Sequence, residues 1–200
     1  MKVEEFVDPY LGQSWGSLGA RVLTSGNQVS VTLGYPAAGL QADLAVQLAA
    51  FLEVDTVDLQ LNFAVSGGSG FGQVKHIVLV SSGKGGVGKS TTAVNLALAL
   101  DAEGAKVGLL DADIYGPSQG MMLGVAEGQR PNIKDGKHFE PIRAHGLKAM
   151  SMSFMTTDKT PMVWRGPMAS GALQQILGQT LWGDLDYLIV DMPPGTGDIQ

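Results

Sequence analysis

The strongest constraint on this chain is the segment 83–90, which reads Gly-Lys-Gly-Gly-Val-Gly-Lys-Ser. It matches the phosphate-loop pattern G-x-x-x-x-G-K-[ST] at every defined position. Glycines let a backbone turn tightly, so successive N–H groups can converge on an anion. Lys89 is expected to reach the outer phosphates, and the Ser90 hydroxyl is expected to bind Mg²⁺. The segment therefore predicts a site for a nucleoside triphosphate and its metal ion.

The residues on either side of this segment have the pattern that a phosphate loop requires. Residues 76–81 form a short, apolar, β-branched run, which is typical of a strand buried on both faces of a parallel sheet. Residues 91–100 are rich in Ala and Leu and predict a helix whose N-terminus faces the phosphates. The predicted nucleotide contacts from this region are Gly83, Lys84, Gly85, Gly86, Val87, Gly88, Lys89, Ser90 and Thr91.

Two further apolar runs end in acidic residues. Residues 106–110 are followed by Asp111 and Asp113, and residues 187–190 are followed by Asp191. Ligands of open α/β sheets bind at the carboxyl ends of the strands, so these carboxylates are expected beside the phosphates. Asp191 is predicted to hold Mg²⁺ through a bound water. Asp113 is predicted to orient the attacking water, whereas Asp111 is expected to cap the next turn.

Three loop residues extend the predicted site. Gly195 and Gly197 would let the loop after Asp191 swing, with a backbone N–H, assigned to Gly195, sensing the γ-phosphate. Lys84 allows two interpretations from the residues alone. It is either a solvated loop lysine or a cation that crosses a dimer interface to the partner's phosphate, as an arginine finger does elsewhere.

The loop 83–90 resembles the deviant phosphate loop of the MinD/ParA/nitrogenase-iron-protein class of dimeric ATPases. Segments 111–118, 163–168 and 191–198 resemble the Mrp/ApbC branch of that class, the ATP-dependent iron–sulfur cluster carriers. The resemblance is dense over residues 73–200. It implies an α/β fold of the P-loop NTPase type, with a mostly parallel, doubly wound sheet.

The resemblance also implies functional roles. Lys84 becomes the lysine that acts in trans, and it is grouped with Lys89 and Asp113 as catalytic. Ser90 becomes a Mg²⁺ ligand, Asp113 falls in switch I and Asp191 in switch II. The expected activity is slow, Mg-dependent ATP hydrolysis by a cytoplasmic homodimer. The expected cargo is a [4Fe–4S] cluster, taken from a donor scaffold and delivered to apo-protein clients.

The chain departs from this family pattern in one respect. Carriers of this branch are expected to hold the bridging cluster on a C-x-x-C pair well downstream of switch II, and this chain contains no cysteine. It is therefore interpreted as truncated at its C-terminal side, with no iron–sulfur ligands of its own. The cluster is expected only in the full-length protein.

Composition excludes several function classes. The net charge is −6 and there is no basic stripe, which disfavours nucleic-acid binding. No apolar run approaches the ~20 residues that a membrane span requires, and residues 1–5 lack the apolar core of a signal peptide. These features predict a cytoplasmic protein with neither a nucleic-acid nor a membrane partner.

Residues 1–65 have the pattern of a separate, small α+β domain. A strand pair connected by residues 25–28, a helix within 39–53 and a strand at 57–63 follow one another, after a helix predicted near residues 4–11. The order and the segment 8–12 resemble the MIP18-like domain that precedes such ATPases. Its role is either docking of a donor or client, or passive interaction. Residues 66–73 are Gly- and Ser-rich and predict a flexible linker before the ATPase domain at 74–200.

Other segments are less informative. Residues 127–148 predict an insertion loop or hairpin. The methionines between 150 and 168 are interpreted as core filling rather than as a dimer or client surface. Three alternative functions are considered: a MinD-like membrane-associated regulator, a nitrogenase-like reductase, and a scaffold that binds a nucleotide without hydrolysing it. A nitrogenase-like reductase carries a cluster cysteine before switch II, and this chain has none there.

Overall fold

The computed structural model describes residues 2–65, 67–68, 72–155 and 166–195, with side chains of the last range from residue 170 onward. The chain divides into two compact units. Unit 1 comprises Met1–Gly67 with Ala102–Gly104, and unit 2 comprises Gly68–Asp101 with Ala105–Gln200. Residues 66 and 69–71 of the predicted linker, and residues 196–200 after the last strand, lie outside the described residues.

Unit 1 is an α+β unit built on a three-stranded sheet. Its elements are η1 (Val3–Glu5), β1 (Arg21–Ser25), β2 (Gln28–Leu33), η2 (Ala38–Leu40), α1 (Gln41–Leu52) and β3 (Asp58–Phe63). The sheet has the order β1-β2-β3, in which β1 is antiparallel and β3 parallel to β2. The alternating apolar residues of β2 and the helical repeat of α1 are buried together, so the predicted hairpin, helix and strand are confirmed.

The helix predicted near residues 4–11, with an interruption near Pro9, forms only as a first turn. Only the 3₁₀ turn Val3–Glu5 forms, and the backbone then reverses so that Asp8 N–H donates to the Gln13 carbonyl. The buried Asp8 carboxylate accepts hydrogen bonds from the N–H groups of Tyr10 and Leu11. Proline at position 9 and this local capping by an aspartate both favour a turn over a helix.

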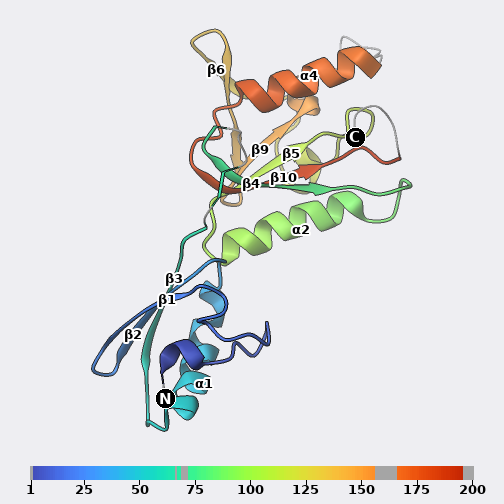
Figure 1. Ribbon diagram of the computed structural model, residues 1–200. Coiled ribbons are helices and arrows are strands. Elements are labelled where there is room, and N and C mark those ends of the chain that lie inside the picture. The colour runs from blue at the N-terminus through green and yellow to red at the C-terminus, as the bar shows by residue number, and fades with distance from the viewer. Residues whose placement is uncertain (1, 66, 69–71, 156–165, 196–200) are drawn as a thin grey trace. The chain divides into compact units, whose positions relative to one another are not determined.

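Unit 2 contains the larger sheet. Its helices and strands are β4 (Val74–Val80), α2 (Lys89–Ala102), β5 (Val107–Asp111), α3 (Gln119–Met122), β6 (Asn132–Lys134), β7 (His138–Glu140), β8 (Ile142–Ala144), β9 (Leu147–Ser151), η3 (Met152–Phe154), α4 (Gly166–Gln179) and β10 (Leu185–Asp191). The sheet order is β4-β10-β5-β9-β8, and only β8 is antiparallel to its neighbour. Figure 1 shows α2 and α4 on opposite faces of this sheet, which confirms the predicted α/β fold.

Of the two predictions for residues 127–148, an insertion loop or a hairpin, the hairpin is confirmed as β6–β7. The chain then continues into β8 and β9, which join the main sheet with β9 beside β5. Met150 and Met152 are buried in the core of unit 2, and Met155 packs against it, so core filling is confirmed for these three. No described helix is long and apolar enough to cross a membrane.

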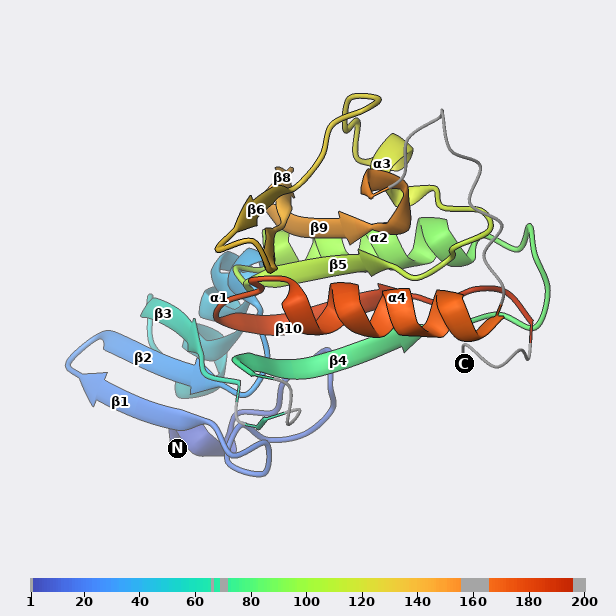
Figure 2. The ribbon, with the colours of Figure 1, turned by 90° about the horizontal axis from the view of Figure 1, so that it is seen from above.

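This topology brings the predicted site residues to one edge. Strands β4, β10 and β5 are parallel neighbours, seen side by side in Figure 2, so their carboxyl ends coincide. The loops that follow them begin at Ser81, Met192 and Ala112. Binding sites in open α/β sheets lie at this edge.

Candidate functional site

The phosphate loop lies between β4 and α2, as its pattern predicts. Gly86 and Gly88 have φ angles of +76° and +88°, a region that other residues rarely adopt, and no atom outside the loop approaches the Cβ that either glycine lacks. Gly86 and Gly88 are exposed. Four neighbouring residues are exposed as well: Gly83, Gly85, Val87 and Thr91. The loop backbone is therefore open to a ligand, and left-handed residues in such a loop can turn several N–H groups toward one anion.

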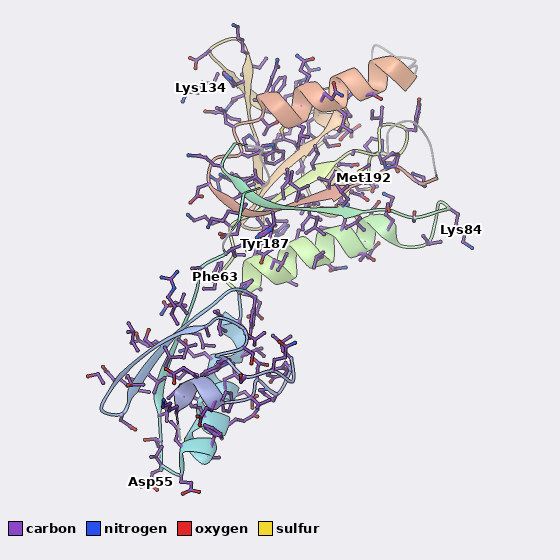
Figure 3. The ribbon with its side chains drawn as sticks, viewed as in Figure 1. Asp55, Phe63, Lys84, Lys134, Tyr187 and Met192 are labelled. Carbon is purple, nitrogen blue, oxygen red and sulfur yellow. The ribbon has the colours of Figure 1, made fainter. Side chains whose placement is uncertain are left out.

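Lys84 and Lys89 have opposite environments in this loop. Lys84 is exposed, and Figure 3 shows it at the outer end of the loop, away from the sheet. Lys89 is 9% exposed and points inward. Its Nζ donates to the Asp191 carboxylate and to Ser90 Oγ (3.1 Å), and it lies 3.9 Å from Asp113 Oδ2. The structure thus gathers Lys89, Ser90, Asp113 and Asp191 into one cluster.

Asp111 lies beside this cluster but has a different role. Its buried carboxylate accepts hydrogen bonds from the N–H groups of Asp113 (3.1 Å), Ser118 (2.9 Å) and Gln119 (3.0 Å). It therefore organises the turn that leads into α3, which confirms the capping interpretation. Burial raises the pKa of Asp111 to about 6, even though these backbone donors act in the opposite direction.

Asp113 is held by the same turn. Its Oδ1 accepts a hydrogen bond from the N–H of Gly116 (3.1 Å), while Oδ2 faces Lys89. The residue is 9% exposed, so a water molecule near this carboxylate would be largely shielded from bulk solvent. This position is consistent with a residue that orients water close to the phosphates.

The loop after β10 is described only as far as Gly195. Gly195 has a φ of +98°, and its N–H donates to the Ser82 carbonyl (2.9 Å). This N–H could contact a γ-phosphate only after it releases the Ser82 carbonyl. The predicted sensing role therefore stays a prediction. Gly197 and the remainder of the predicted switch II loop lie outside the described residues.

Gln119 is the site residue that sequence reasoning missed. Its side chain is buried, and Nε2 donates to the Ser90 carbonyl (3.0 Å) and to Asp191 Oδ2 (2.8 Å). The sequence contains no signal that separates this glutamine from a surface amide. Only the three-dimensional approach of the start of α3 to the end of β10 reveals it.

The cluster has the chemistry of a magnesium site. The Lys89 ammonium donates to both Ser90 Oγ and the Asp191 carboxylate, so a positive charge is stabilised where these two oxygen-bearing groups converge. The described residues do not contain a metal site built entirely from three or more His, Cys, Asp or Glu side chains. A magnesium site does not need one. Mg²⁺ is typically bound through one or two carboxylates plus substrate phosphates and waters, which these residues fit.

The sheet, the glycine-rich loop and the carboxylates at its edge define a nucleotide-binding domain of the P-loop NTPase class. More narrowly, the chain belongs to the family whose model is described as "ParA: NUBPL iron-transfer P-loop NTPase", which matches residues 73–200. The branch inferred from the segments around Asp111 and Asp191 is thereby confirmed.

Known relatives agree with this membership. The iron-sulfur cluster carrier protein of Pseudomonas fragi is 72% identical over 131 residues, covering 66% of this chain and 46% of that protein. The protein of the same name from Deinococcus radiodurans is 46% identical over 203 residues, covering 96% and 58%. A solved nucleotide-binding protein from Archaeoglobus fulgidus, in complex with ADP, is 39% identical with a TM-score of 0.54, covering 64% and 48%. The chain spans about half the length of these proteins.

Proposed function

We propose that this chain binds MgATP, hydrolyses it slowly, and uses the nucleotide state to control delivery of an iron–sulfur cluster. The observation that carries the nucleotide part is the cluster of Lys89, Ser90, Asp113 and Asp191 directly beneath an open, glycine-rich loop. The carrier part is supported by the names of the relatives and by the family description. Those relatives do not favour the MinD-like alternative.

Each residue of the cluster has a role in this proposal. The N–H groups of residues 83–91 surround the phosphates, and Lys89 turns from Asp191 toward them. Ser90 and Asp191 would hold Mg²⁺, Asp191 through a bound water, and the metal would neutralise charge on the phosphates. Asp113 orients the water that attacks the γ-phosphorus in line as the bond to ADP breaks.

Lys84 is proposed to act across a homodimer. Its exposure at the outer end of the loop leaves the ammonium free to reach the phosphates of a second copy. A charge supplied in trans stabilises the transition state only in the dimer. Hydrolysis per subunit should therefore rise with protein concentration until the dimer is saturated.

Nucleotide binding and turnover of four variants test these roles. Lys89→Ala should lose ATP binding, whereas Asp113→Asn should bind ATP and lose at least tenfold in turnover. Lys84→Ala should bind ATP but lose the dependence of turnover on concentration. Lys137→Ala, another exposed lysine of unit 2, is the matched control. Wild-type turnover in Asp113→Asn would refute the role of Asp113, and absent turnover in the wild type would favour the non-hydrolysing scaffold.

The cluster itself is cargo in this proposal. Because the chain contains no cysteine, thiolate ligands would have to come from outside these 200 residues. Partners are a donor scaffold and apo-protein clients in the cytoplasm. Transfer of a reconstituted cluster from the full-length protein to an apo-ferredoxin should depend on MgATP. Transfer at the same rate with and without nucleotide would refute nucleotide control.

A further inference from the structure

Gln119 connects the two residues that are proposed to hold magnesium. Its side-chain nitrogen uses both hydrogens, one on the carbonyl of Ser90 and one on the carboxylate of Asp191. Its backbone N–H is fixed by Asp111. The first turn of α2, the end of β10 and the start of α3 therefore meet at one amide group.

The oxygen atom of the Gln119 amide lies in an unfavourable environment. Gln119 Oε1 is buried and has no hydrogen-bond partner among the described residues. A buried acceptor without a partner is unfavourable, and an apolar side chain of similar size would avoid it. Turning the amide over would place Oε1 against the Ser90 carbonyl and the Asp191 carboxylate, which are both acceptors. The stabilising contribution of the Gln119 side chain therefore comes from the two hydrogen bonds that Nε2 donates.

We propose that Gln119 is the positioning residue of the magnesium site, a role that rests on the proposed function. Its amide nitrogen sets the separation between the turn that carries Ser90 and the carboxylate of Asp191. When Lys89 turns to the phosphates, Asp191 loses its ammonium partner. Gln119 is then the remaining side-chain donor to Asp191 within the described part of the chain, so it keeps this carboxylate oriented toward the metal.

The test separates metal-dependent from metal-independent nucleotide binding. N-methylanthraniloyl-ADP is titrated into the whole chain in EDTA and at increasing MgCl₂, with wild type, Gln119→Met and Gln129→Met. Methionine keeps the size of the buried side chain but removes both donors. Gln129 is an exposed glutamine of unit 2 and serves as the control. Loss of a hydrogen bond to a charged group predicts that Gln119→Met raises the magnesium midpoint about tenfold, with unchanged affinity in EDTA.

Each outcome decides a separate question. Absence of probe binding by the wild type would refute the proposed function itself. If the wild type binds, then an unchanged magnesium midpoint in Gln119→Met overturns the positioning role. A loss of probe affinity that is equal in EDTA and in magnesium also overturns the positioning role, because it would show a purely structural effect. Circular dichroism checks that each variant is folded. If Gln119→Met does not fold, the same titration is made with Gln119→Asn, whose shorter side chain cannot reach both acceptors.

Discussion

Buried charge is concentrated at the carboxyl edge of the larger sheet. Asp111 and Asp191 have no exposed surface, and Lys89 and Asp113 are each 9% exposed. An ion taken out of water is costly unless a counter-charge or hydrogen bonds compensate it. Lys89 compensates Asp191, whereas Asp111 accepts hydrogen bonds from backbone N–H groups of its own loop and from the Ser151 hydroxyl. Burial without a cationic partner is the main reason that the pKa of Asp111 is raised.

Replacing Asp111 should change how the stability of unit 2 depends on pH. Its pKa is raised from 3.8 to about 6 in the folded protein, so folding favours the protonated form. This contribution to stability is fully present below pH 3.8 and is lost as the pH rises through about 6. A shift of about two units corresponds to on the order of 3 kcal/mol. The stability of the wild type relative to Asp111→Asn should fall by that order between pH 4 and pH 7.

The measurement is hydrogen exchange of the β5 amides at graded urea concentrations, which reports unit 2 by itself. It is made at pH values from 4 to 7 on both proteins. The asparagine substitution also changes hydrogen bonding, but that effect is independent of pH. Parallel stability curves for the two proteins would contradict the raised pKa.

At the scale of elements, β5 is the most enclosed strand of the sheet. All five of its residues are buried, between β10 and β9. Gly108 leaves room for the side chains that cover it. A Cβ at this position would lie 2.7 Å from Leu185 Cδ1, 2.9 Å from Leu188 Cδ1 and 3.1 Å from Trp182 Cε3. Close packing here keeps Asp111, at the end of the strand, in register with Asp191.

Two glycine-to-alanine substitutions in unit 2 should have opposite signs. Gly108→Ala should destabilise the unit by about 1–3 kcal/mol, because the added methyl group overpacks a strand that cannot move. Gly171→Ala, on the exposed side of α4 with nothing near its Cβ, should stabilise it by up to about 1 kcal/mol through helix propensity. Urea unfolding measures both. Equal effects of the two substitutions would show that the space around Gly108 is not limiting.

The elements differ in how far sequence predicts them. Strands β4, β5 and β10 are continuous apolar runs that end in functional loops, and all three were predicted. Strand β9 reads Leu-Lys-Ala-Met-Ser, which has neither alternation nor strong β propensity. It forms because it pairs with β5 in the finished sheet, from Gly108–Lys148 to Asp111–Ser151. Such pairing between distant segments is invisible in a local pattern.

The same limit applies within the site. The motif positions 83–90, 113 and 191 are recognisable because glycines, a lysine and strand-terminal carboxylates have direct phosphate and metal chemistry. Gln119 has none of these features. Its importance depends on two acceptors that lie 29 and 72 residues away in sequence. A supporting residue of this kind is found only when the loops that it joins have been placed in space.

At the scale of the whole molecule, the two units have separate cores. The core of unit 1 surrounds Trp15, Leu44 and Leu48, and that of unit 2 surrounds Leu110, Leu188 and Trp182, with no residue in common. The chain carries a net charge of −6, and residues 1–66 contain two basic and seven acidic side chains. All of the proposed nucleotide contacts belong to unit 2. Ligand binding should therefore stabilise one unit selectively.

Hydrogen exchange with and without MgADP tests this selectivity. A ligand at one hundred times its dissociation constant stabilises the state that binds it by about 2.7 kcal/mol. The slowest amides of β4, α2 and β5 should gain protection of that order, whereas those of β2 and α1 should exchange as before. Lys89→Ala should abolish the gain, because the phosphates lose their ammonium partner. Equal protection of both units would instead show that they unfold as one cooperative body, and the nucleotide state would then reach unit 1 through folding stability itself.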